Sequence, residues 1–215
     1  MRIKLSPEDL QDEVEFELLA EVSHQKLREF VIEQIRKEKY IIRIYSVYQI
    51  IMLLLFGFFL TRSIVLLIKG YTEAFAGVGL AILFSFTALV IIHELLHALA
   101  YLLTGARKIS FGFILKKFIF YALADRQVIA AKAFHVVALA PFVIIKMLCL
   151  IIILKTGNTG LFYFSMTVMC LHSLFCAGDI AMLSFYRLHH GKEIYNFDNR
   201  SEGKTYFYMR IKKSA

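Results

Sequence analysis

Four long hydrophobic stretches constrain the fold of this chain more than any other feature. They cover approximately residues 44–68, 75–103, 130–154 and 161–186. Each has at least 25 residues, enough for a tilted helix to cross a hydrocarbon core of about 30 Å. The hydrophobic fraction is 59%, whereas a soluble domain has roughly 45–50%. The sequence therefore predicts an all-α membrane protein with four transmembrane helices, and the lipid bilayer is its first predicted partner.

Positive charges are distributed unevenly around these stretches. The net charge is +8, and its position beside hydrophobic segments follows the positive-inside rule rather than the pattern of a nucleic-acid-binding face. The bias places both termini and residues 104–130 in the cytosol of a cell-membrane protein. The flanking basic residues are Arg36, Lys37, Lys39, Arg43, Arg107, Lys108, Lys116, Lys117, Arg126, Lys132, Arg187 and Lys192.

The polar ends of the chain complete the predicted organisation. Ser6, Pro7 and Asp9 resemble a helix start with a capping box, and apolar residues then recur at helical spacing. We expect an amphipathic helix over about 7–39, in an N-terminal cytosolic segment 1–40. A four-helix membrane domain then covers 41–187, and a cytosolic tail covers 188–215.

Short β-prone runs lie on the predicted cytosolic side. They cover 109–115 and 118–122 around Lys116-Lys117, and 194–197 and 205–211 in the tail. Such runs predict strand hairpins at the membrane surface. The tail is interpreted as a structural appendage rather than a site.

The second stretch contains His93-Glu94-Leu95-Leu96-His97, the pattern H-E-x-x-H. Residues four apart on a helix lie about 5–6 Å apart on one face, so both imidazoles can bind one Zn²⁺ at about 2.0–2.1 Å. Glu94 then flanks the metal as a base for the attacking water. Glu94 and Asp179 are the only acids in the four stretches, and an acid in the bilayer is a functional candidate. The alternative is a polar cluster that joins helices.

Asp179 is the candidate third ligand. His97 and His93 lie roughly 9 and 15 Å from the cytosolic end of the second stretch, and Asp179 lies roughly 10 Å from that end of the fourth. The two stretches run in the same direction, so all three groups are expected to meet at one level. A carboxylate that pairs with Lys or Arg between helices is the alternative.

Several neighbours are candidates for supporting roles. His172 precedes Asp179 by seven residues and could orient the site or donate to a substrate carbonyl, or simply join two helices. Cys176 is expected to line the pocket without binding metal, and Gly178 to allow close helix approach. Pro141 is expected to kink the third stretch and free a carbonyl. The chain has three cysteines and no CxxC pair, so no disulfide framework is predicted.

These motifs, with Ala138-Leu139-Ala140-Pro141 and His172 to Ile180, resemble the bacterial putative zincin peptidase family, which is similar to site-2 intramembrane proteases. The resemblance covers roughly 75–187. It implies zinc as cofactor, His93, His97 and Asp179 as ligands, and Glu94 as catalytic base. It also implies that a substrate strand pairs with the β-prone 109–122 segment. Here Asp179 is followed by Ile180, whereas site-2 proteases carry Asp-Gly.

The resulting hypothesis is a zinc metalloendopeptidase that cleaves membrane-spanning or membrane-proximal peptides. One rival is a non-catalytic scaffold or sensor whose zinc only joins helices. A second is an ion or metal transporter, since intramembrane His and Asp also line ion paths. The outer halves of the second and fourth stretches, such as 77–88 and 161–169, have almost no ionisable groups, which argues against a path through the membrane.

Overall fold

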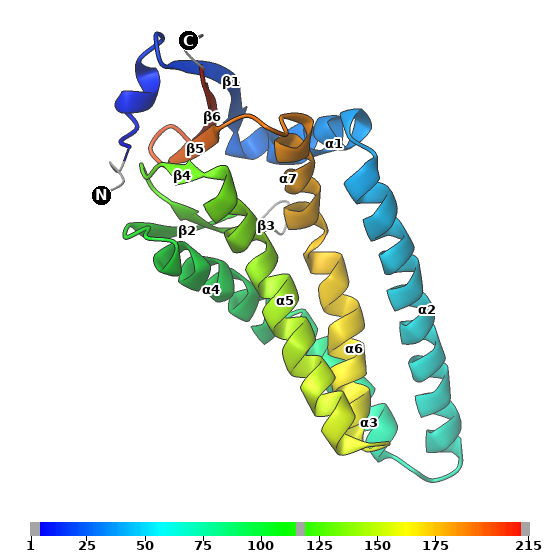
Figure 1. Cartoon of the computed structure of the whole chain (residues 1–215). Helices are drawn as coiled ribbons and strands as arrows, with labels where there is room; N and C mark the ends of the chain where they lie inside the picture. Colours follow the sequence, from blue (N-terminus) through cyan, green and yellow to red (C-terminus); the bar gives the residue numbers. More distant parts are fainter. Residues whose placement is uncertain (1–4, 115–118, 212–215) are drawn as a thin grey trace.

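The computed structural model describes residues 5–114 and 119–211, and it shows an elongated helical bundle with strands gathered at one end (Figure 1). Both described ends of the chain lie at this strand end. The bundle helices are α2 (Tyr40–Ile68), α3 (Glu73–Ser85), α4 (Ala88–Leu103), α5 (Ala131–Thr156), α6 (Gly160–Phe175) and α7 (Ala177–Leu188).

Two of these helices, α2 and α5, are each long and apolar enough to cross a membrane. The pairs α3–α4 and α6–α7 pass the same criteria only as pairs, with bends of 52° and 43° at their breaks. The described part of the chain therefore has two candidate spans, or up to four if each bent pair is one span. The predicted second and fourth spans are interrupted helices rather than continuous ones.

The break between α6 and α7 is held by side chains of α2. The Ser173 carbonyl accepts hydrogen bonds from the Tyr45 hydroxyl and, at 2.6 Å, from Gln49 Nε2. Ser173 Oγ also donates to Gln49 Oε1 at 2.9 Å. Backbone groups released inside a membrane need such partners, because lipid offers none. The polar groups at the bend are thus satisfied by side chains of α2.

The strands form two antiparallel sheets. The larger has the order β1-β6-β5-β4. Phe207 of β6 is fully buried in a cluster with Val22, Phe185 and Ile194. The smaller sheet pairs β2 with β3. The strands are β1 (Phe16–Ser23), β2 (Ile109–Ile114), β3 (Ile119–Ala124), β4 (Ile129–Ala130), β5 (Ile194–Asn199) and β6 (Lys204–Arg210).

The predicted hairpins are therefore confirmed, both in the 109–122 segment and in the tail. Lys116 and Lys117 of the first hairpin, like the first and last four residues of the chain, lie outside the described residues. The fold is mainly helical, as predicted, but the helical bundle carries two sheets, so the term all-α is too narrow.

The helix predicted over 7–39 is also wrong. The Ser6–Asp9 capping box exists, with Ser6 N donating to Asp9 Oδ2 at 2.7 Å, but it opens only the short turn η1 (Asp9–Gln11). Residues 16–23 form β1, and helix resumes at η2 (His24–Lys26) and α1 (Leu27–Lys37). Apolar residues at 16, 18, 20 and 22 fit a strand as well as a helix, and pairing with β6 decides between them. The two polar ends of the chain thus share one sheet.

Candidate metal centre

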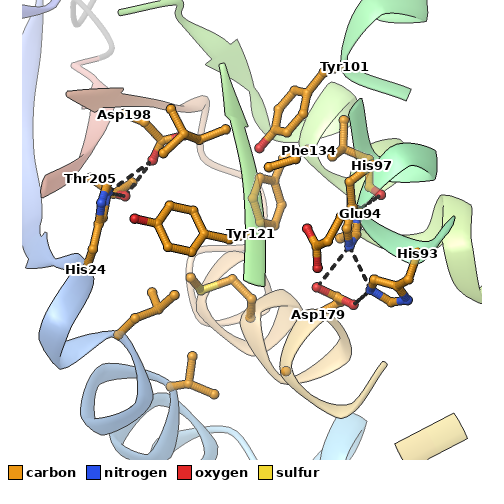
Figure 2. Close-up of a pocket in the computed structure, with 18 of the residues that line it drawn as sticks. His24, His93, Glu94, His97, Tyr101, Tyr121, Phe134, Asp179, Asp198 and Thr205 are labelled. Atoms are coloured by element: carbon orange, nitrogen blue, oxygen red, sulfur yellow. Dashed lines mark hydrogen bonds and ion pairs between the residues drawn. The ribbon is translucent and has the colours of Figure 1, made fainter. Parts of the chain in front are cut away.

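The centre begins on the buried stripe of α4. Leu89, His93 and His97 recur every four residues and are buried together, so they form one face of this Ala- and Leu-rich helix. His93 and His97 are each 6% exposed, and their Nε2 atoms lie 3.1 Å apart. Two imidazoles therefore point at one place, with Glu94 beside them (Figure 2).

Asp179 completes the group from α7. Its Oδ2 lies 3.2 Å from His93 Nε2, and its Oδ1 lies 3.4 Å from His97 Nε2. Asp179 stands in the first turn of α7, where the helix dipole favours negative charge. The break in the span therefore creates a favourable position for this acid, and the structure brings together the three side chains that the depth argument predicted.

The donor spacing fits a zinc ion. In a tetrahedral site with bonds of about 2.0–2.1 Å, neighbouring donor atoms lie about 3.3 Å apart. The three separations here are 3.1, 3.2 and 3.4 Å. Two neutral imidazoles and one carboxylate are also a usual donor set for catalytic zinc, which keeps its fourth position for water or substrate.

His97 is oriented by a carbonyl that proline leaves free. His97 Nδ1 lies 2.9 Å from the Val137 carbonyl, which can only accept, so Nδ1 carries the proton and Nε2 keeps its lone pair for a metal. Val137 lies four residues before Pro141 within α5. Proline has no N–H for that carbonyl. The predicted free carbonyl therefore exists, although α5 runs unbroken through Pro141.

His93 is oriented by His172, whose Nε2 lies 3.0 Å from His93 Nδ1. His172 is fully buried behind His93, and it is absent from the cavity wall. Of the roles expected for His172, orienting the site fits this position, whereas contact with a substrate carbonyl does not. The reason is the break at Cys176, which ends the seven-residue alignment of His172 with Asp179.

Cys176 and Gly178 also differ from the predictions. Cys176 is fully buried against His172, with Sγ 3.6 Å from both ring nitrogens, and it does not line the pocket. His93, His172 and Cys176 could form a second metal-binding group, but it would be closed to substrate. Gly178 lines the cavity, where an added Cβ would meet no atom within 4 Å. Gly178 therefore leaves space in the cavity and does not mark a close contact between two helices.

A cavity of about 830 Å³ connects the centre with the sheets, which is within the range of about 300–1,000 Å³ for ligand pockets. Glu94 lines it, and Glu94 Oε2 is a buried atom without a hydrogen-bond partner among the described residues. Strand β3 supplies Tyr121, Ala122 and Leu123 to the wall. An unpartnered carboxylate oxygen at the edge of a cavity is available to a water or a substrate.

The far end of the cavity is formed by two segments for which the sequence predicted no functional role. The tail contributes Asn196, Asp198, Thr205 and Phe207, and His24 comes from η2. The tail therefore lines the cavity, whereas the sequence predicted only a structural appendage there. Neither spacing nor composition marks these residues, because strand pairing between distant segments brings them to the cavity.

The geometry defines a helical protein with two to four candidate spans and a His-His-Asp group beside a glutamate at a deep cavity. The chain matches the putative zincin peptidase family over residues 86–194, about half of its length, and it belongs to that family. This match includes His93, Glu94, His97 and Asp179. Neither the curated proteins nor the solved structures contain a match to this chain.

Proposed function

We propose that this protein is a membrane-embedded zinc metallopeptidase that hydrolyses peptide bonds of membrane or membrane-proximal substrates. The observation that carries the proposal is the meeting of His93, His97 and Asp179 at donor spacing from two interrupted spans, with Glu94 at the same cavity. Membership of the putative zincin peptidase family supports the same chemistry.

In this proposal His93, His97 and Asp179 hold the zinc. When bound, such an ion lowers the pKa of a water molecule and polarises a substrate carbonyl. Glu94 takes the proton of the attacking water through its free Oε2 and later returns a proton to the leaving amine. His172 and the Val137 carbonyl keep the two imidazoles in the orientation that presents Nε2 to the metal.

Strand β3 is the proposed docking edge for the substrate. Among the described residues β3 forms a sheet only with β2, and its residues 121–123 line the cavity beside Glu94. A helical substrate hides its carbonyls in internal hydrogen bonds, so cleavage requires an extended segment. A strand edge at a cavity offers backbone partners to such a segment. The cavity then holds the extended chain alongside the metal centre.

The orientation in the membrane is part of the same proposal. The basic residues flank the strand end of the bundle, so the positive-inside rule supports a cytosolic position for the sheets and both termini. The metal centre then lies inside the bilayer, with the cavity as its route for water from the cytosolic side.

Substitution of Glu94 by Gln tests the proposal against a non-catalytic zinc scaffold. Membranes that contain wild-type protein are compared with membranes that contain Glu94→Gln, by mass spectrometry of newly formed peptide termini and by metal analysis of the purified proteins. We expect the new termini to fall by about 10²–10⁴-fold, because the proton-transfer group is lost, while zinc stays stoichiometric. Equal termini in both membranes would refute catalysis.

A further inference from the structure

The end of the cavity remote from the metal centre holds a second polar group, here called the Asp198 cluster: His24, Asp198 and Thr205. Thr205 Oγ1 donates to Asp198 Oδ1 at 2.5 Å. His24 Nε2 lies 3.2 Å from Thr205 Oγ1 and 3.9 Å from Asp198 Oδ1. Because the hydroxyl gives its only proton to Asp198, His24 Nε2 must be the donor to Thr205. The hydrogen bonds therefore run from His24 to Thr205 and from Thr205 to the Asp198 carboxylate.

Asp198 is an anion without a strong counter-ion. The residue is 8% exposed, and across residues 5–114 and 119–211 its sole ion-pair contact is with His24. Burial lowers the pKa of His24, so the imidazole is neutral at neutral pH. Burial, with a contribution from nearby Asp125, raises the pKa of Asp198 to about 6, so the carboxylate is charged at pH 7. A charge in such a place is costly unless something binds it.

A purely structural role does not account for this charge. Asp198 and Thr205 are cross-strand partners in β5 and β6, so their hydrogen bond also joins the hairpin. A neutral pair such as Asn with Thr would make the same bond without burying a charge. The carboxylate also faces the cavity that contains the metal centre, with the ring of Tyr121 between the two ends (Figure 2). Perturbed acids in clefts are candidates for ligand contact.

The apolar walls of the cavity favour a long side chain with a charged tip. Leu27, Val31 and Met182 line the cavity, as does Phe134. Lys and Arg bury their aliphatic stems along apolar surface while the charged head finds a polar partner. Arg28 also lines the cavity, but within the described part of the chain Asp198 has an ion-pair contact with His24 alone, so Arg28 leaves the carboxylate available.

We propose that the Asp198 cluster binds the Lys or Arg side chain of a peptide substrate whose backbone extends to the metal centre. This inference rests on the proposed function and adds the substrate class: segments with a basic residue beside the cleavage region. Basic residues are frequent where membrane proteins leave the bilayer on the cytosolic side. His24, Asp198 and Thr205 lie outside residues 86–194 that match the family, so the recognition end comes from the flanking segments of this chain.

Binding to full-length Glu94→Gln protein in detergent micelles tests the cluster without any need for cleavage. The probes are fluorescent, N-acetylated apolar peptides in which one Lys is moved along the sequence. The matched peptides carry norleucine, which lacks only the ammonium group, at the same positions. Fluorescence anisotropy gives Kd. At one position we expect Lys to bind about ten- to a hundredfold more tightly than norleucine, as for hydrogen bonds to a charged group.

The same measurement in the double variant Glu94→Gln/Asp198→Asn should reduce this preference to about twofold or less, because Asn keeps the Thr205 bond but loses the charge. Asp125→Asn is the matched control, since Asp125 is an acid near Asp198 that does not line the cavity. It should leave the preference unchanged. Equal affinity for the Lys and norleucine peptides in Glu94→Gln protein would overturn the proposal even if the double variant fails to fold. A preference for Lys that persists in the double variant would also overturn it.

Cleavage of the same peptides by wild-type protein separates this inference from the proposed function. If peptides bind with the Lys preference but are never cut, the Asp198 cluster is supported and the peptidase is contradicted. If peptides are cut at equal rates with Lys or norleucine, the peptidase is supported and the Asp198 cluster is contradicted. An unacetylated norleucine peptide that binds as tightly as the Lys peptide would assign the cluster to a chain terminus instead, which also overturns the proposal.

Discussion

Each imidazole of the candidate metal centre has one nitrogen for the metal and one for a protein partner. His97 uses the Val137 carbonyl, and His93 uses His172. The carbonyl fixes the proton on His97 Nδ1 without ambiguity, whereas the His93–His172 bond requires a particular tautomer of both rings. His172 is therefore a positioning residue whose chemistry, and not only its volume, matters.

We expect His172→Leu to weaken zinc binding by about 10–100-fold, the usual loss when an outer partner of a ligating histidine is removed. His172→Gln, which retains a hydrogen-bonding group, should lose less. The measurement is competition for zinc against a chelator of known affinity. His189→Leu is the control, because His189 caps the end of α7 and bonds to the Phe185 carbonyl of that helix. Equal affinities in wild type and His172→Leu would show that His93 needs no partner.

Asp198 also predicts a pH dependence of stability. The groups that interact with it are His24, Thr205, Asp125, Tyr101 and Tyr186. Its pKa rises from 3.8 to about 6 on folding, so the unfolded chain ionises first. The protein thus loses stability as pH rises from about 4 to about 6, by about 3 kcal/mol in total.

Asp198→Asn should remove this loss. Its melting temperature in detergent should match wild type near pH 4 and exceed it by roughly 6–12 °C above pH 7, at about 2–4 °C per kcal/mol for a chain of this size. A constant difference between the two proteins across this pH range would contradict the assignment. A stabilised variant with impaired recognition is the usual signature of a functional charge.

The residues of the metal centre could be predicted because their signals are local or depend on depth. His93, Glu94 and His97 lie within five positions of one helix, and Asp179 follows from the equal depth of two parallel spans. His24, Asp198 and Thr205 could not be found in this way. Their meeting depends on which strands pair, and strand pairing is a long-range property that no spacing in the sequence encodes.

At the scale of elements, interruptions of the helices supply the polar contacts of the bundle. Pro141 frees the Val137 carbonyl for His97, and the α6–α7 break exposes the Ser173 carbonyl to Tyr45 and Gln49. The sequence predicted the four hydrophobic stretches and the free carbonyl. It did not predict the bends of 52° and 43°, because the residues around them are as apolar as a continuous helix.

Pro141→Ala tests whether the interruption in α5 serves the metal. Alanine restores an N–H opposite the Val137 carbonyl and removes the strain of proline, so the apoprotein should be at least as stable as wild type. Competition with His97 for that carbonyl should lower zinc affinity by up to about tenfold. Val143→Ala, an exposed position on the same helix, is the control. Unchanged zinc affinity with unchanged stability would show that His97 holds its orientation by packing alone.

At the scale of the whole molecule, two long-range connections hold the chain together. Pairing of β1 with β6 joins the two polar ends in one sheet, and the His-His-Asp group joins α4 to α7, which belong to two bent helix pairs. The sequence does not predict the first connection, because residues 16–23 also fit helical spacing and the partner strand β6 lies far away in the chain. The second connection needs no sheet. Without an ion it consists of two imidazoles beside one carboxylate, and we expect a bound ion to strengthen it because all three groups would then bind the same positive charge.

Zinc should therefore stabilise the whole protein and not only its centre. At a free concentration of about 100 times Kd, binding to the folded state adds about 2.7 kcal/mol, which corresponds to roughly 5–11 °C in melting temperature. The melting temperature in detergent is measured with zinc, after chelation, and after zinc is restored. Asp179→Ala should melt near the chelated wild type and respond little to zinc, because the connection from α4 to α7 loses its only ligand on α7. If Asp179→Ala retained the full zinc shift, the ion would bind elsewhere, and the group of His93, His172 and Cys176 would be the alternative centre.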